Sequence, residues 1–168
     1  VREILRIVAK RRLTAKAKWR DSSVIVKLFF SPIHWKRNLS RDLTGINLLI
    51  ERNLRTPAIL HETQIAGGRG AALILEYINK GKTISECLDE AKTNSERQRW
   101  LSLAIDSISA CHRQGLWQPD IHMKNFLESD NQVYYLDGGD IRALERSLPS
   151  ELAVKNLALF FAQFTVDN

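Results

Sequence analysis

Residues 118–127, QPDIHMKNFL, place an acid, a histidine and an amide within one short stretch. Asp120 is followed by His122 and then by Asn125. A second acidic stretch, LDGGD at residues 136–140, comes after the polar segment ESDNQVYY. These residues leave two interpretations open. They form either a metal-bound phosphoryl-transfer centre or two acidic surface turns.

Phosphoryl transfer needs phosphates and a divalent metal held in line with an acceptor hydroxyl, and a group that receives or orients the proton. Mg²⁺ prefers one or two carboxylates, phosphate oxygens and water as ligands. Asp120 and Asn125 on one tight loop can serve the acceptor and the metal, and Asp137 can hold the metal from the next hairpin. In the alternative, Asp137 and Asp140 cap a structural turn with their side chains.

A lysine interrupts the most strongly β-forming stretch of the chain, VIVKLFF at residues 24–30. Together with the alternating residues 11–19, this stretch predicts a hairpin that turns at Asp21-Ser22-Ser23. A charge inside an apolar strand is costly unless it is paired. Lys27 is therefore a candidate phosphate-binding residue. In the alternative, simple alternation puts it on a solvent face.

The composition is that of a globular protein with an excess of positive charge. The 168 residues are 44% hydrophobic, and the formal charge is +6. Cys87 and Cys111 stand alone, which argues against a disulfide scaffold or a zinc site. No apolar run approaches the roughly 20 residues of a membrane span, and the basic N-terminal region lacks the apolar core of a signal peptide. The basic residues of this region are Arg2, Arg6, Lys10, Arg11, Arg12, Lys16, Lys18 and Arg20.

Hydrophobic periodicity predicts a small sheet with one helix, followed by a mainly helical part. The first helix is expected over residues 38–52 with Ser40 as its cap, and a glycine-rich turn at residues 67–70 joins two strands. Strands are expected at residues 11–19, 24–30, 58–64, 71–77, 126–127 and 133–136. Further helices are expected at residues 84–91, 95–114, ended by Gly115, and 149–164. The predicted class is therefore α+β.

The ordered set of motifs resembles the protein-kinase-like fold. The Asp-x-His-x-x-Asn form is closer to bacterial sugar and small-molecule kinases than to eukaryotic protein kinases. Three segments together look like the lipopolysaccharide core kinase family, which phosphorylates heptose or Kdo of the inner core. They are residues 41–60, residues 112–127 and residues 134–144. The tail VKNLALFFAQF, residues 154–164, is also similar to that family.

This resemblance implies a two-lobed molecule. A β-rich N-terminal lobe with one helix spans residues 1–78, and a helical, apparently shortened C-terminal lobe spans residues 79–168. In the first lobe, Lys27 would contact the α- and β-phosphates of ATP, and Asp42 would pair with Lys27. Glu76, Tyr77 and Ile78 would form the hinge that meets adenine through its backbone.

In the second lobe, the resemblance makes Asp120 the catalytic base, or the acid that orients the acceptor. Asn125 and Asp137 would hold Mg²⁺, and His122 would support the loop. Gln118-Pro119 precedes Asp120 where many kinases have His-Arg, and Gly138-Gly139 follows Asp137 where many have phenylalanine. Both features fit the bacterial branch. No glycine precedes Gly45, so a recognisable glycine-rich phosphate loop is missing.

The sequence thus predicts an ATP- and Mg²⁺-dependent kinase of a lipopolysaccharide core sugar. It is expected in the cytoplasm, with the basic N-terminal region against the anionic inner face of the cytoplasmic membrane. Within the same fold, a protein or small-molecule kinase is an alternative, since a fold does not choose its acceptor. A pseudokinase that binds nucleotide as a scaffold is another. A nucleic-acid-binding domain is a further alternative, which only the net positive charge supports.

Overall fold

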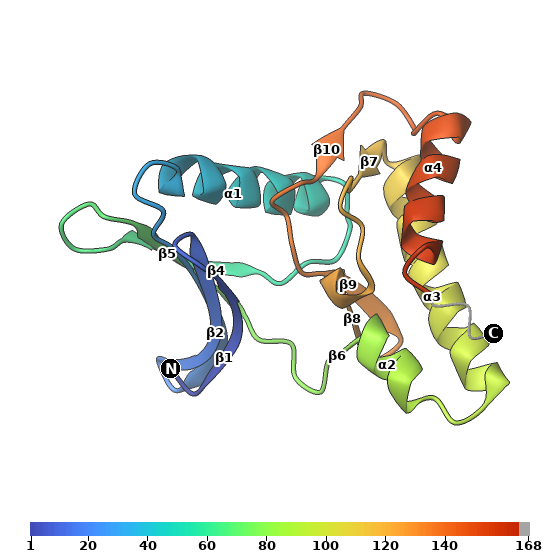
Figure 1. Ribbon diagram of the computed structural model, residues 1–168, viewed down its shortest axis with the longest axis horizontal. Coiled ribbons are helices and arrows are strands. Elements are labelled where there is room, and N and C mark those ends of the chain that lie inside the picture. Colours follow the sequence, from blue (N-terminus) through green and yellow to red (C-terminus); the bar gives the residue numbers. More distant parts are fainter. Residues whose placement is uncertain (165–168) are drawn as a thin grey trace. The chain divides into compact units, whose positions relative to one another are not determined.

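The computed structural model describes residues 1–164 as a mixed α+β chain with an N-terminal antiparallel sheet (Figure 1). Its contacts divide the chain into two compact units. The first comprises residues 1–43 and 57–79, and the second comprises residues 44–56 and 80 onward. The sequence-based division after residue 78 differs because it gives residues 44–56 to the N-terminal part. No helix within residues 1–164 is long and apolar enough to cross a membrane.

The first unit is built on a five-stranded antiparallel sheet in the order β1-β2-β3-β5-β4. Its core gathers Ala17, Val24 and Ile74, with Trp19 and Val26 packed against them. The alternation of apolar and polar residues along β2 and β3 puts these side chains on one face. The strands are β1 (Glu3–Val8), β2 (Arg12–Trp19), β3 (Ser22–Phe29), β4 (Ile59–Gln64) and β5 (Ala71–Glu76).

Strand β1 was not predicted from the sequence. It pairs with β2 along the edge of the sheet, and its side chains are exposed except for the half-buried Val8. Its apolar residues Ile4 and Ile7 are 55% and 62% exposed. The strand was missed because its short apolar pattern lies among the basic residues, which suggested a charged surface segment instead.

The turn between β2 and β3 lies at Arg20-Asp21, one residue before the predicted position. Both residues have positive φ, at 48° and 66°. This is the conformation of a two-residue hairpin turn, which glycine or asparagine usually occupies. The prediction of a hairpin is confirmed, as is the hairpin at the glycine-rich turn, where Gly67 and Gly68 have φ of 80° and 67° between β4 and β5.

Helix α1 (Trp35–Glu51) starts three residues before the predicted helix. Ser40 therefore lies inside the helix, and the prediction that it caps the helix is wrong. Ser31 binds the turn that leads into the helix instead, because its Oγ accepts from the His34 amide at 3.3 Å. Asn53, with φ of 56°, ends the helix in the left-handed conformation typical of this position.

The second unit is mainly helical, with short strands between the helices. Thr83 and Thr93 form capping boxes with Glu86 and Glu96 that fix the starts of α2 and α3. Gly115, with φ of 73°, ends α3 as predicted. The elements are β6 (Lys82–Thr83), α2 (Ile84–Glu90), α3 (Asn94–Arg113), β7 (Leu116–Trp117), η1 (Met123–Asn125), β8 (Phe126–Ser129), β9 (Gln132–Tyr135), β10 (Arg142–Ala143) and α4 (Ser150–Phe161).

The core of the second unit lies behind the loop that contains Asp120. Phe126 and Phe160 are fully buried there and pack edge to face, with ring centroids 6.0 Å apart. Ile108 and Leu116 from α3 and β7 belong to the same cluster. Strands β6, β8 and β9 form a small sheet, and β7 pairs with β10. Aromatic and aliphatic side chains thus support the loop from the interior.

Candidate functional site

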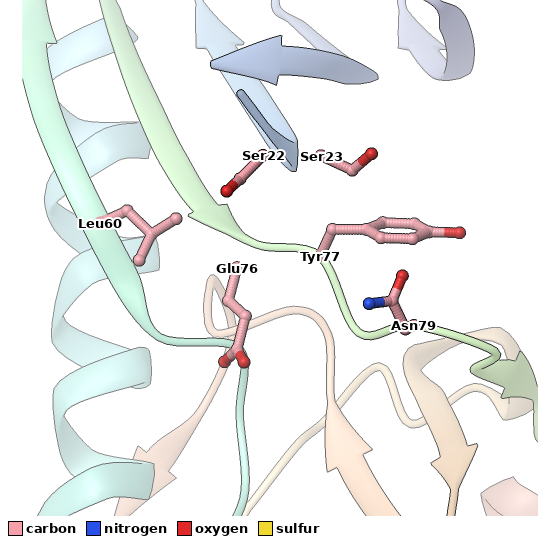
Figure 2. A pocket seen from close by; sticks show the side chains of 6 residues that line it. All are labelled: Ser22, Ser23, Leu60, Glu76, Tyr77 and Asn79. Atoms are coloured by element: carbon pink, nitrogen blue, oxygen red, sulfur yellow. The ribbon is translucent and has the colours of Figure 1, made fainter. Parts of the chain in front are cut away.

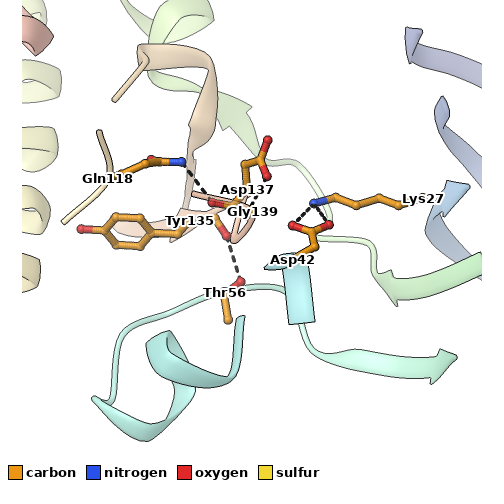
Figure 3. A network of polar contacts seen from close by, with 7 residues as sticks. All are labelled: Lys27, Asp42, Thr56, Gln118, Tyr135, Asp137 and Gly139. Carbon is orange, nitrogen blue, oxygen red and sulfur yellow. Dashed lines mark hydrogen bonds and ion pairs between the residues drawn. The ribbon is translucent and has the colours of Figure 1, made fainter. Parts of the chain in front are cut away.

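The first part of the candidate site is a buried ion pair between Lys27 and Asp42 (Figure 3). Lys27 Nζ lies 2.9 Å from Asp42 Oδ2 and 3.3 Å from Oδ1. The residues are 5% and 0% exposed. The predicted pairing is confirmed, and the alternative that places Lys27 on a solvent face is wrong.

Strand β3 and helix α1 position this pair. β3 lies between β2 and β5, so Lys27 starts from the interior of the sheet, with Thr14 and Leu73 as its register partners. The amphipathic helix directs Asp42 inward together with the buried Leu39. The carboxylate of Asp42 therefore reaches the ammonium group. The contact with the carboxylate holds the Lys27 side chain in one orientation.

A pocket of about 410 Å³ opens at the end of the sheet where β5 finishes and β3 begins (Figure 2). Glu76 and Tyr77, two of the three predicted hinge residues, line it, whereas Ile78 is not among its lining residues. Glu76 is tied to the start of β4 in both directions. Its amide donates to Ala58 O at 2.9 Å, and its carboxylate accepts from the Ala58 amide at 3.2 Å.

The second part of the candidate site is the loop that contains Asp120, His122 and Asn125. Asp120 is exposed, and Asn125 Nδ2 donates to its carbonyl oxygen at 3.5 Å. His122 Nδ1 accepts from the Lys124 amide at 3.1 Å, and its carbonyl accepts from the Asn125 amide at 2.8 Å. His122 therefore closes the tight turn η1.

Two amides from the end of the chain hold this loop, and the sequence analysis assigned no role to either. Asn156, on α4, is 1% exposed, and its Nδ2 donates to Gln118 O at 2.8 Å. Gln163 donates to Ile121 O at 2.9 Å and accepts from the Met123 amide at 3.1 Å. The signal in the sequence was that these two amides stand among the apolar residues of the tail motif, residues 154–164.

Asn156 is oriented in turn by His112 of α3, at an Nε2 to Oδ1 distance of 2.9 Å. His112 must be the donor, because the Asn156 oxygen has only lone pairs to offer. Burial lowers the pKa of His112, although the Asn156 contact raises it in part. Burial also raises the pKa of the nearby Cys111 thiol to about 12, so this thiol is not a reactive nucleophile.

The LDGGD stretch lies against the Asp120 loop within the second unit. The Leu136 amide donates to Asn125 O at 2.9 Å. Gln118 Nε2 donates to Asp137 O at 3.1 Å (Figure 3). Asp137 Oδ1 accepts from the Gly139 amide at 3.1 Å. Asp137 thus caps a local turn, as the structural alternative for this stretch requires, and the same turn sets the direction of its carboxylate.

Gly45 of α1 allows the closest backbone approach to this stretch. A Cβ atom at residue 45 would lie 1.8 Å from Gly138 O and 2.5 Å from its carbonyl carbon. No side chain fits in that space, so only glycine permits the helix and the LDGGD stretch to touch. In the sequence, Gly45 stands out only as the first glycine of the chain.

The residues of the second unit fit a magnesium ion bound partly by phosphate. Within residues 1–164, no three His, Cys, Asp or Glu side chains gather as a metal site. Magnesium bound to a nucleotide needs fewer protein ligands, because phosphate and water oxygens complete its shell. The Asn125 amide turns its nitrogen to Asp120 O, so its oxygen is the end suited to a cation. Asp137 supplies a carboxylate from the neighbouring turn.

The structure thus brings Lys27 and Asp42 together in the first unit, and Asp120, His122, Asn125 and Asp137 in the second. Comparison with models of known protein families found no match for this chain. Comparison with curated proteins found no match either.

Proposed function

We propose that this chain is an ATP-dependent phosphotransferase with a two-lobed, protein-kinase-like fold, in which the two units are the lobes. The observation that carries the proposal is the buried Lys27–Asp42 pair. A buried ion pair is often no more stabilising than apolar side chains in its place, so a buried lysine on a central strand points to a use of its charge. Phosphate binding is such a use, and the carboxylate keeps the ammonium group oriented for it.

In the proposed reaction, Lys27 contacts the α- and β-phosphates of ATP, and the backbone of Glu76, Tyr77 and Ile78 meets adenine. Asn125 and Asp137 would hold Mg²⁺, which when bound neutralises the charge of the phosphates. Asp120 accepts the proton of the acceptor hydroxyl while the oxygen of that hydroxyl forms a bond to the γ-phosphorus. The bond from that phosphorus to the β–γ bridging oxygen breaks, and ADP leaves.

The exposure of Asp120 supports its role in this scheme. A base that works on a bound acceptor must be reachable from outside, and its position must be fixed. Asn125 holds the carbonyl of Asp120, and the amides of the C-terminal region hold the loop on both sides of it. The backbone at Asp120 is thus fixed while its carboxylate faces outward.

The resemblance of the motifs to the lipopolysaccharide core kinases supports the acceptor, a sugar hydroxyl of heptose or Kdo. Such a substrate is anchored in a membrane and is itself acidic. The basic N-terminal region would then lie against the anionic inner face of the cytoplasmic membrane. We therefore propose that the protein works in the cytoplasm at that surface. A protein or small-molecule acceptor of the same chemistry is the alternative.

A nucleotide-binding scaffold without turnover is the second candidate function. The contact of Asp137 Oδ1 with the Gly139 amide favours it, because that oxygen already serves a structural turn. A scaffold would bind nucleotide without any product that depends on Asp120.

The test is ATP turnover with magnesium, with and without lipopolysaccharide from a strain that lacks core phosphate. Asp120→Ala should lower transfer to the lipid fraction by about 10²- to 10⁴-fold, the usual contribution of a general base. Asp106→Ala, an exposed aspartate on α3, is the matched control and should keep full transfer. Equal transfer by parent and Asp120→Ala would show that the site assignment is wrong. Nucleotide binding without transfer by the parent would favour the scaffold.

A further inference from the structure

Strand β2 presents a row of polar side chains on one face of the sheet. Arg12, Thr14 and Lys16 alternate with Leu13, Ala15 and Ala17, so the polar and apolar sets point to opposite faces. The apolar set includes core residues of the first unit. The polar set shares its face with Lys27, because Thr14 is the register partner of Lys27.

A bulge in β1 adds a further cation to this face. The register pairs Ile4 with Ala15 and Arg6 with Thr14, and it shifts between Ile4 and Arg6. Without that shift, Arg6 would follow Ile4 onto the apolar face, because side chains two residues apart share a face. Bulges often re-aim a side chain near a functional site. Here the bulge turns Arg6 to the side of Thr14 and Lys27.

Four cations therefore surround Thr14 on what we call the basic face, formed by Arg6, Arg12, Thr14, Lys16 and Lys27. Arg6 and Lys27 flank Thr14 on the neighbouring strands, at a strand spacing of about 4.8 Å. Arg12 and Lys16 lie on either side of it along β2, each about 6.8 Å away along the strand. Thr14, with a small side chain and a hydroxyl group, occupies the centre.

The simplest explanation of such a row is a solvated surface, which fits the exposed Arg6, but the burial of the other three cations argues against it. Arg12 and Lys16 are half-buried, and Lys27 is 5% exposed. Positive side chains gathered on one face attract anions, and partial burial strengthens that attraction. No glycine occurs in β1, β2 or their connection, so a glycine-rich backbone cradle for phosphate is absent from this hairpin.

The basic face continues towards the pocket of the first unit. Lys16 Nζ lies 3.8 Å above the centre of the Tyr77 ring, and Tyr77 lines that pocket. Lys16 thus stands between the pocket and the row that contains Thr14 and Lys27. A ligand with an aromatic base at one end and a chain of phosphates at the other matches this order of groups.

We propose that the basic face binds the polyphosphate of a nucleoside triphosphate through the side chains of Arg6, Arg12, Lys16 and Lys27, with Thr14 at its centre. These cations do the work that backbone amides do in a glycine-rich loop. The inference rests on the proposed function for the role of Lys27 as a phosphate ligand, and it names the other phosphate ligands of the first unit.

The test is calorimetric binding of inorganic tripolyphosphate and of ATP to the full chain without divalent metal, which leaves the magnesium ligands out of the measurement. Arg12→Gln and Lys16→Gln should each weaken binding of both ligands by about 10-fold, the loss expected for one charge-assisted contact. Glu3→Gln should tighten binding, because Glu3 is the register partner of Lys16. Arg97→Gln, an exposed arginine on α3, removes the same charge and should bind as the parent does.

The outcomes separate this inference from the proposed function. If Arg12→Gln and Lys16→Gln bind tripolyphosphate as tightly as Arg97→Gln while the parent transfers phosphate, the inference is overturned and the function stands. If these two variants lose affinity but the parent transfers no phosphate, the basic face is supported and the phosphotransferase fails. A parent that binds neither tripolyphosphate nor ATP would overturn both.

Discussion

The two regions of the candidate site hold their functional groups in place in different ways. In the first unit, the groups proposed to bind ligand are also the structural groups, because Lys27 and Asp42 are buried and bond to each other. In the second unit, the two roles are divided. Asp120 is exposed, while Asn156 and Gln163 hold the backbone around it. Changes to the first region should therefore cost stability, and changes to Asp120 should cost chemistry alone.

The largest effect that follows from this difference is at Asp42. Asp42→Ala leaves the buried Lys27 ammonium without its carboxylate, which should lower the free energy of unfolding by about 3–5 kcal/mol. Asp120→Ala removes an exposed carboxylate and should change it by less than about 0.5 kcal/mol. Urea unfolding of both variants measures the two values side by side.

A double substitution serves as the control for the Asp42 experiment. Lys27→Met combined with Asp42→Leu replaces the whole ion pair by apolar side chains, so it should recover most of the lost stability. If Asp42→Ala costs no more stability than Asp120→Ala, the contrast between the two regions disappears. The Lys27–Asp42 pair would then contribute no more to the free energy of unfolding than a surface ion pair does.

A smaller loss of stability is expected from a substitution at Gly45, which lies against the turn that contains Asp137 in the second unit. Alanine is the better helix former, but its Cβ would lie 1.8 Å from Gly138 O, so the LDGGD stretch must move. Gly45→Ala should cost about 1–3 kcal/mol of stability, the usual range for overpacking. It should also raise the magnesium concentration needed for half-maximal transfer, because Asp137 lies in the displaced turn.

Gly68→Ala is the matched control for Gly45→Ala. Nothing lies within 4 Å of a Cβ at this position, but its φ of 67° is unfavourable for alanine. It should therefore cost about 1–2 kcal/mol through the backbone alone, with an unchanged magnesium requirement. A normal magnesium requirement in Gly45→Ala would mean that the contact with Gly138 does not position Asp137.

The parts of this structure that could be predicted are those that short-range sequence patterns determine. The sequence around Lys27 is a strong strand, and the resemblance to the kinase motifs indicated Asp42 as the partner of that lysine. Strand β1 was missed because its pattern is short and its side chains are exposed. The turn at Arg20-Asp21 was misplaced because neither residue is the glycine or asparagine that positive φ usually requires.

The contacts that fix the Asp120 loop could not be derived, because they join residues far apart in the sequence. Asn156 reaches Gln118, and Gln163 reaches Ile121. Nothing local in the tail shows which carbonyl an amide will find. The same holds for Gly45, because the requirement for glycine at this position arises only from the contact with Gly138. Local patterns thus predicted the chemical groups, and the tertiary structure supplied the residues that hold them.

The smallest predicted effect concerns pH and tests whether the second region depends on a neutral His112. Burial lowers the pKa of His112 in the folded protein below its ordinary value of 6.5. The unfolded chain therefore takes up a proton first as the pH falls. The stability due to His112 is complete above about pH 6.5, and it is lost as the pH falls from there through the lowered folded pKa.

The variant His112→Gln can still donate to Asn156, but its free energy of unfolding should lack the pH-dependent contribution of His112. Parent and variant should thus differ in slope between about pH 7 and pH 5 by less than one bound proton, about 1.4 kcal/mol per pH unit. Parallel curves from urea unfolding at each pH would show that the charge state of His112 does not matter to the loop it supports.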